Sequence, residues 1–68
     1  MGFAKNLTNL IKENNLSYKK VADGAGVNER AVSFWAQGKR VPSLVNAKKI
    51  ADYFGLTLDE IAKESQEV

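Results

Sequence analysis

The chain has 68 residues, with ten Lys and Arg, eight Asp and Glu, and neither Cys nor His. A chain of this length forms one small domain, and its net charge of +2 is too small to identify a binding partner. The missing Cys and His exclude the usual ligands of zinc, haem and iron–sulfur clusters and most acid–base and nucleophilic arrangements. We therefore predict a single domain, residues 1–68, without metal, cofactor or enzymatic activity.

Apolar residues recur at helical spacing along the whole chain, and no stretch alternates as a half-buried strand does. Phe3, Leu7, Leu10 and Ile11, for example, form one stripe of an amphipathic helix. The pattern predicts an all-α, compact domain of five short helices, at about residues 3–14, 18–25, 29–37, 44–54 and 58–64, followed by a frayed tail at 65–68.

Capping signals separate the predicted helices. Side chains that can accept a hydrogen bond from a free backbone N–H stand where the later helices begin, namely Ser17, Asn28, Ser43 and Thr57, the last with Glu60 completing a capping box. Three helices are followed by a glycine, which tolerates a left-handed backbone: Gly26, Gly38 and Gly55. A further glycine, Gly24, lies inside the second helix, where it costs about 1 kcal/mol relative to Ala, and no local feature accounts for it.

The apolar stripes also predict which residues face the core. In the second to fifth helices these are Val21, Ala22, Ala25, Ala31, Val32, Trp35, Leu44, Ala47, Ile50, Ala51, Phe54, Leu58, Ile61 and Ala62. Tyr53 falls outside the stripe of the fourth helix, so we expect it to be exposed.

The joint between the second and third helices is informative about function. Only Gly26, Val27 and Asn28 separate the two helices, and a short turn that contains Gly is typical of the helix-turn-helix motif of DNA-binding proteins. Such turns also occur in other all-α domains, so the spacing favours DNA binding without establishing it.

The outward side of the third helix carries Glu29, Arg30, Ser33, Phe34 and Gln37. Arg and Gln pair with guanine and adenine edges, Glu accepts from cytosine, and an aromatic ring can contact a thymine methyl group. A solvated helix face explains the polar side chains equally well. It does not explain Phe34, because a large exposed ring usually meets a partner.

Basic residues gather in the first part of the chain. Residues 1–40 carry seven basic and three acidic side chains, a net +4, whereas residues 41–68 carry three and five, a net −2. Lys19 and Lys20 lie in the first turn of the second helix, where a docked phosphate would be favourable. Lys39 and Arg40 follow the third helix. An ordinary solvated surface remains an alternative for Lys19 and Lys20.

Between Leu16 and Ile61, many residues match the pattern of one known family of proteins, in unbroken order. The matching residues are Leu16-Ser17, Val21-Ala22, Ala25-Gly26-Val27, Val32-Ser33, Trp35, Gly38-Lys39, Pro42-Ser43, Lys49-Ile50-Ala51 and Gly55-Leu56-Thr57-Leu58-Asp59-Glu60-Ile61. In these the chain resembles the lambda-repressor-like helix-turn-helix family of phage repressors, Cro proteins and bacterial transcriptional regulators. The match covers about two thirds of the chain.

The resemblance implies a recognition helix in the major groove and dimers bound to an operator of double-stranded DNA. Base-reading positions would be Glu29, Arg30, Ser33 and Phe34. Phosphate-binding positions would be Tyr18, Lys19, Asn28, Gln37, Lys39 and Arg40. A weak homodimer would form through Tyr53, Leu56 and the start of the fifth helix.

Two departures from the family pattern concern its polar residues. The family often has Gln where this chain has Tyr18 and Glu29, and Glu29 serves either as a hydrogen-bond acceptor on DNA or as a partner of the helix dipole. The family also often pairs an Arg with a Glu where this chain has Ile11 and Ala36. Both partners are absent together, an exchange that can be neutral for stability.

We therefore predict a sequence-specific DNA-binding transcriptional regulator, a repressor or Cro-like protein that acts as a dimer. The alternative is a helix-turn-helix module that binds protein, as an antitoxin or antirepressor partner does, and Tyr18, Glu29 and Phe34 favour it. No apolar run is long enough to cross a membrane. We expect a cytoplasmic, nucleoid-associated protein with no small-molecule ligand, either complete or the head of a longer repressor.

Overall fold

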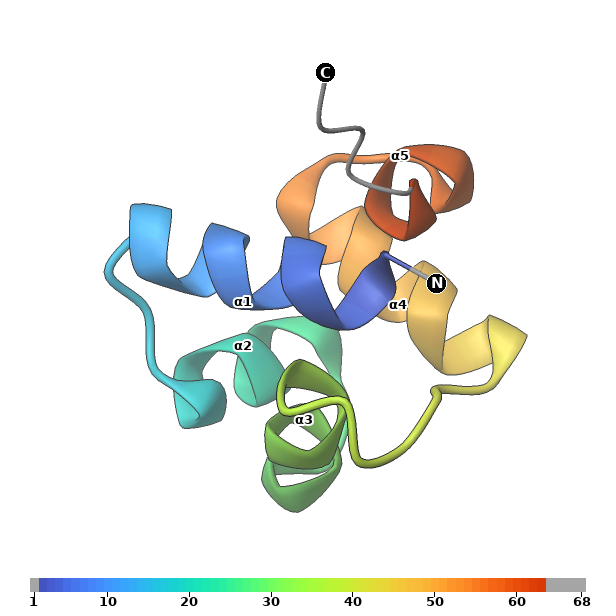
Figure 1. The fold of residues 1–68 in the computed structure, drawn as a ribbon. Coiled ribbons are helices and arrows are strands. Elements are labelled where there is room, and N and C mark those ends of the chain that lie inside the picture. Colours follow the sequence, from blue (N-terminus) through green and yellow to red (C-terminus); the bar gives the residue numbers. More distant parts are fainter. Residues whose placement is uncertain (1, 64–68) are drawn as a thin grey trace.

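A computed structural model describes residues 2–63, which form five α-helices and no strand. The helices are α1 (Phe3–Glu13), α2 (Tyr18–Ala25), α3 (Glu29–Ala36), α4 (Leu44–Phe54) and α5 (Leu58–Ala62) (Figure 1). The all-α prediction is confirmed, and the first four helices match the predicted ranges to within one residue at each end. The fifth ends at Ala62, and the predicted tail lies outside the described residues.

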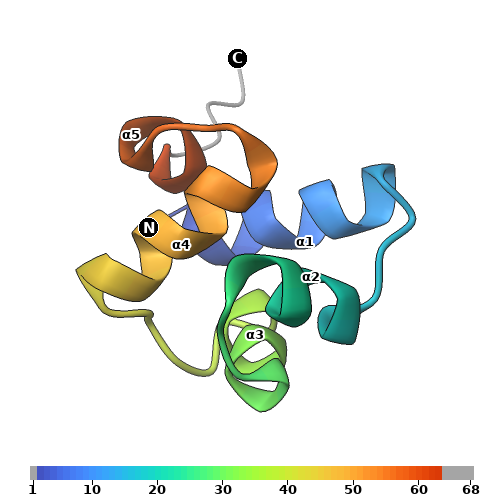
Figure 2. The same cartoon turned by 180° about the vertical axis from the view of Figure 1, so that it is seen from behind.

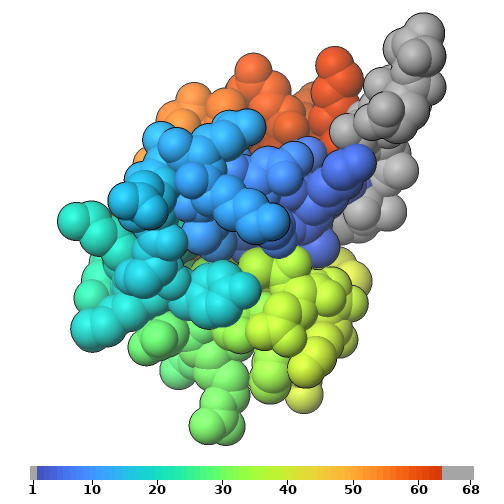
Figure 3. All heavy atoms as spheres, turned by 60° about the vertical axis from the view of Figure 1, so that its left-hand side comes forward, coloured from blue at the N-terminus to red at the C-terminus, as the bar shows by residue number. Residues whose placement is uncertain are grey.

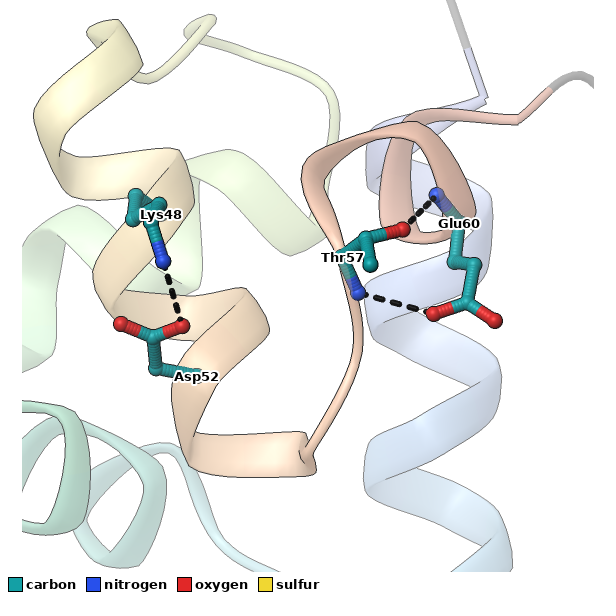
Figure 4. Close-up of polar contacts among 4 residues, drawn as sticks. All are labelled: Lys48, Asp52, Thr57 and Glu60. Atoms are coloured by element: carbon teal, nitrogen blue, oxygen red, sulfur yellow. Dashed lines mark hydrogen bonds and ion pairs between the residues drawn. The ribbon is translucent and has the colours of Figure 1, made fainter.

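The predicted caps form in each case. The side chains of Ser17, Asn28 and Ser43 accept hydrogen bonds from backbone N–H groups in the first turns of α2, α3 and α4. At α5, Thr57 Oγ1 accepts from the Glu60 N–H at 3.1 Å, and Glu60 Oε1 accepts from the Thr57 N–H at 2.8 Å (Figure 4). Each helix after α1 therefore begins at a residue that its own sequence specifies.

The core lies where α1 crosses the other helices. In Figures 1 and 2, α1 runs across the middle of the molecule, with α2 and α3 on one side of it and α5 on the other, while α4 lies beside α1 and packs on both α2 and α5. Every helix contributes at least one buried apolar side chain, and the buried set is Phe3, Leu7, Val21, Ala22, Val32, Trp35, Ile50, Ala51 and Ile61. No polar side chain of the described residues is buried, so apolar packing holds the helices in place.

Two polar side chains of α1 fasten it to its neighbours. Thr8 Oγ1 donates to the carbonyl oxygen of Ala36 at the end of α3, over 2.8 Å. Asn6 Nδ2 lies 2.8 Å from the carbonyl oxygens of both Ile61 and Lys63, at the C-terminal end of α5. These bonds satisfy carbonyls that a helix end leaves without an intrahelical partner. The first bond joins α1 to the end of α3.

The inward prediction is wrong for Leu44. Its side chain is 73% exposed, and with Val41 and Val45 it forms an apolar surface at the start of α4. The first turn of α4 extends beyond the packed helices (Figure 1), so an apolar stripe that is regular along α4 has nothing to pack against there. Helical periodicity gives the direction of a side chain but not the extent of the neighbouring surface.

Tyr53 is also placed differently from the prediction. It is half-buried and packs against the core, and its ring lies edge-on to that of Phe54, with 5.0 Å between the ring centroids. The ring rests on α2 at Gly24, where an added Cβ would overlap Cε1 of Tyr53 and lie 2.6 Å from Cδ1. The glycine inside α2 thus has a structural reason, because it lets α2 and α4 approach each other across an aromatic ring.

Candidate nucleic-acid interface

The turn between α2 and α3 orients α3 relative to the rest of the molecule. Gly26 takes a left-handed backbone with φ of +76°, and the N–H groups of Gly26 and Val27 both donate to the carbonyl oxygen of Ala22. This arrangement ends α2 and turns the chain within three residues. In Figures 1 and 2, α3 lies at one end of the molecule and crosses α2.

The two sides of α3 have opposite character. Val32 and Trp35 face the core, with 0% and 4% of their surface exposed, and the Trp35 ring meets Phe3 edge-on at a centroid distance of 6.5 Å. On the other side, Glu29 and Arg30 are exposed. In the space-filling view of Figure 3, α3 and the following loop form the lower end of the molecule, next to the start of α2. The buried side anchors the helix while the outer side remains accessible.

The structure brings the predicted base-reading residues together in one surface hollow of about 600 Å³. All four lie in its lining, with two of the predicted phosphate-binding residues beside them; the full lining is Tyr18, Asn28, Glu29, Arg30, Ser33 and Phe34. Residues from the start of α2 and from α3 thus share one concave surface. Tyr18 and Phe34 are 16 positions apart in the sequence, and the short turn between α2 and α3 brings them to the same surface.

A second hollow, of about 340 Å³, shares Phe34 with the first and is lined by Asn28, Arg30, Ala31, Phe34 and Arg40. Arg40 comes from the loop after α3, and its guanidinium carbon lies 5.7 Å from the centroid of the Phe34 ring. This is a cation–π contact. Ala31 was not predicted as a site residue, although its position three residues before Phe34 places both on one face of α3.

Hydrogen bonds fix two of the polar groups on this surface. Asn28 Oδ1 accepts from the N–H groups of Arg30 and Ala31, at 2.8 and 3.3 Å, so only the amide NH₂ of Asn28 remains for a ligand. Gln37 Nε2 donates to Ser33 Oγ at 2.8 Å. That bond holds the Ser33 side chain in one orientation and leaves its hydroxyl hydrogen available to donate outward.

The remaining basic residues surround the two hollows without lining them. Lys19 is exposed on α2, and its Nζ lies 3.4 Å from a carboxylate oxygen of Asp23, one turn along the helix. Lys39 is exposed after α3, where its backbone N–H donates to the carbonyl oxygen of Phe34. Exposed ion pairs contribute little, so Lys19 can exchange Asp23 for a phosphate at small cost.

The charge of the surface is predominantly positive. Among the residues that line the two hollows, Arg30 and Arg40 are cationic and Glu29 is the one acid. Glu29 lies in the first turn of α3, where a negative charge is favourable near the helix N-terminus.

Within residues 2–63, no cluster of three or more potential metal ligands occurs, and no helix there is long and apolar enough to span a membrane.

Comparisons with known proteins identify the same helix-turn-helix arrangement in the chain. A family model described as helix-turn-helix, HTH_3, matches residues 7–61. The chain is 33% identical to the HTH-type transcriptional activator BcrR of Enterococcus faecalis over 61 residues. This alignment covers 90% of this chain and 30% of the activator. The chain is 27% identical to the cryptic phage CTXphi transcriptional repressor RstR of Vibrio cholerae over 64 residues. This alignment covers 94% of this chain and 58% of the repressor.

A solved structure has the same fold. The crystal structure of a transcriptional regulator from Listeria innocua aligns with a TM-score of 0.80 and 35% sequence identity, over 97% of this chain and 62% of that one. The chain thus spans less than two thirds of each of these proteins. Since the family model matches most of the chain, and the resemblance seen in the sequence agrees with it, the chain belongs to the helix-turn-helix family HTH_3.

Proposed function

We propose that the chain is the sequence-specific double-stranded DNA-binding domain of a transcriptional regulator, with α3 inserted in the major groove. The observation that carries the proposal is the concave surface on the outer side of α3, which gathers the predicted base-reading residues beside the start of α2 and has Arg30 and Arg40 in the lining of its two hollows. The major groove of B-DNA admits an α-helix, and its base edges are distinguished by hydrogen bonds and methyl contacts. Family membership and the regulators among the relatives support it.

The proposal divides the surface residues into two groups. Base edges are contacted from α3 by Glu29, Arg30, Ser33 and Phe34. Phosphates are bound around that helix by Tyr18, Lys19, Asn28, Gln37, Lys39 and Arg40. Phosphate contacts position the protein, and base contacts give its sequence preference.

We further propose that two copies bind one operator, as repressors or Cro-like proteins do, and exclude RNA polymerase from it. The dimer contact would involve Tyr53, Leu56 and the start of α5. Leu56 and Leu58 are half-buried in the single chain, so part of their surface remains for a partner. Much of the Tyr53 ring packs against α2, which leaves Leu56 and α5 as the larger contribution. Binding to an operator would place the protein at the bacterial nucleoid.

Selection of bound duplexes from random DNA, followed by sequencing, tests the proposal. The expected result is one enriched motif with two related half-sites about one helical turn apart. A pool without an enriched motif, together with a protein partner whose binding is lost in Phe34→Ala, would replace this proposal with the protein-binding alternative. Circular dichroism of the variant shows that any loss of binding does not come from unfolding.

A further inference from the structure

Phe34 is the one large apolar side chain on the outer face of α3, and the core does not account for it. Its ring is half-buried, yet it does not belong to the partly buried residues that pack against the core. It lines both hollows of the candidate interface, and the Arg40 guanidinium holds it from the loop side. A ring placed in this way presents an apolar surface toward a ligand of α3.

Ala31 packs against the core and is half-buried, and the part of it that remains accessible extends this apolar surface. It lines the second hollow together with Phe34, and the cations Arg30 and Arg40 also line that hollow. The subsite thus has an apolar floor with a positive charge at its edge. The major groove offers one strongly apolar group, the C5 methyl of a pyrimidine, and the phosphate and guanine groups nearby suit the cations.

We propose that Ala31 and Phe34 form a subsite for the C5 methyl group of a pyrimidine in the major groove, and that Arg40 positions the Phe34 ring to receive it. The inference rests on the proposed DNA binding and specifies what part of the base this position reads. Thymine and 5-methylcytosine carry the methyl group at the same place on the ring, so either base can supply it.

The test uses the duplex obtained by selection and replaces its thymines with deoxyuridine, one position at a time. Each replacement removes one methyl group and leaves base pairing unchanged. Burial of one methyl group corresponds to about a fourfold change in Kd. We expect one position of each half-site to show about fourfold weaker binding by fluorescence anisotropy, whereas the other positions show no change.

The variant Phe34→Ala connects that effect to the subsite. It is expected to bind the thymine and deoxyuridine duplexes with equal Kd, because the methyl group no longer meets the ring. Lys39→Ala is the matched control: it removes a phosphate contact next to the same subsite, so it weakens both duplexes while the fourfold ratio persists. Thermal unfolding followed by circular dichroism checks that both variants are folded.

A second arm identifies the source of the methyl group. The methyl-dependent T·A pair is replaced by C·G and, separately, by 5-methylcytosine·G. Tighter binding of the methylated duplex, lost in Phe34→Ala, shows that the methyl group itself is recognised, whereas equal binding restricts the subsite to thymine. If the wild type binds the selected duplex but neither deoxyuridine nor 5-methylcytosine changes Kd at any position, the inference is wrong and the proposed function stands. Absence of DNA binding would overturn the proposed function instead.

Discussion

Gly24 shows how one residue can be unfavourable locally and required by its neighbours. In an isolated helix, replacing it with Ala would be stabilising by about 1 kcal/mol. In the folded chain the new Cβ would overlap the ring of Tyr53, which packs between α2 and α4. The ring would have to shift to admit this Cβ, and its edge-on packing against Phe54 opposes the shift, so we expect the steric term to decide the sign.

We therefore expect Gly24→Ala to lower the free energy of unfolding by about 1–3 kcal/mol, as overpacking does when a packed side chain has to be displaced. Urea denaturation followed by circular dichroism measures it. The matched control is the same substitution in a Tyr53→Ala background, where the ring is absent and the change should be neutral or stabilising. A stabilising effect of Gly24→Ala in the wild type would contradict the packing argument.

Arg30 and Lys39 should differ in what they contribute to DNA recognition. Arg30 lines both hollows on the outer side of α3, whereas Lys39 lies beyond its end. Arg30→Ala is expected to reduce discrimination at one base pair by about 1–3 kcal/mol, because a bidentate contact to a base is lost. Lys39→Ala is expected to weaken binding to all sequences alike. Competition assays with the selected site and its single-base variants measure both effects, and identical profiles would show that the roles are not divided in this way.

At the scale of helices, α5 depends strongly on its N-cap residue, Thr57. It has only five residues, and an isolated helix of that length is unstable in water. The reciprocal bonds between Thr57 and Glu60 satisfy two backbone N–H groups, and burial of Ile61 attaches the helix to the core. A nearby ion pair on α4, between Lys48 and Asp52 (Figure 4), is exposed and contributes much less.

We expect Thr57→Ala to destabilise the domain by about 1 kcal/mol, because one N–H group loses its acceptor. Thr57→Ser keeps the hydroxyl group and should retain most of the stability. Thermal unfolding of the three proteins makes the comparison. Lys48→Ala serves as the surface control, with a change expected within about 0.5 kcal/mol; an equal loss in Lys48→Ala and Thr57→Ala would refute the special role of the cap.

The same scale shows what local sequence can predict. The ends of α2, α3 and α4 follow from cap residues such as Ser17, Asn28 and Ser43, which act on backbone groups two or three residues away. The exposure of Leu44 could not be predicted in this way. Its helical phase is correct, but α4 extends past its neighbours, and the length of a packed surface depends on all the helices together.

Over the whole molecule, the basic residues are distributed unevenly with respect to the proposed DNA. Each phosphate contact adds about −0.9 to the slope of log K against log salt concentration. We expect Lys39→Gln to make this slope less negative by about 0.9, the contribution of one phosphate contact. Lys49→Gln, an equal change of charge on an exposed residue of α4 that lines neither hollow, should leave it unchanged. Anisotropy titrations over a salt series measure the slopes, and a flat response in the wild type would argue against DNA binding.

The number of chains on the DNA is also a property of the whole assembly. If two copies bind one operator, native mass spectrometry of the selected duplex should show two chains per duplex, and a half-site duplex should bind one chain more weakly. Sedimentation of the protein alone should show little dimer, because the proposed contact is small. A single chain on the full site would contradict the dimer model.

By itself, the sequence determined the five helices, their starting residues, the helix-turn-helix joint and the family, because apolar spacing, cap side chains and Gly26 act over a few neighbouring residues. It also named the residues that the structure gathers around the first hollow. Only the tertiary structure decided that Gly24 admits the Tyr53 ring, that Leu44 is exposed, and that Arg40 holds Phe34. The physical reason is that these relations depend on distances between elements, which the packing of the whole core sets and no local spacing encodes.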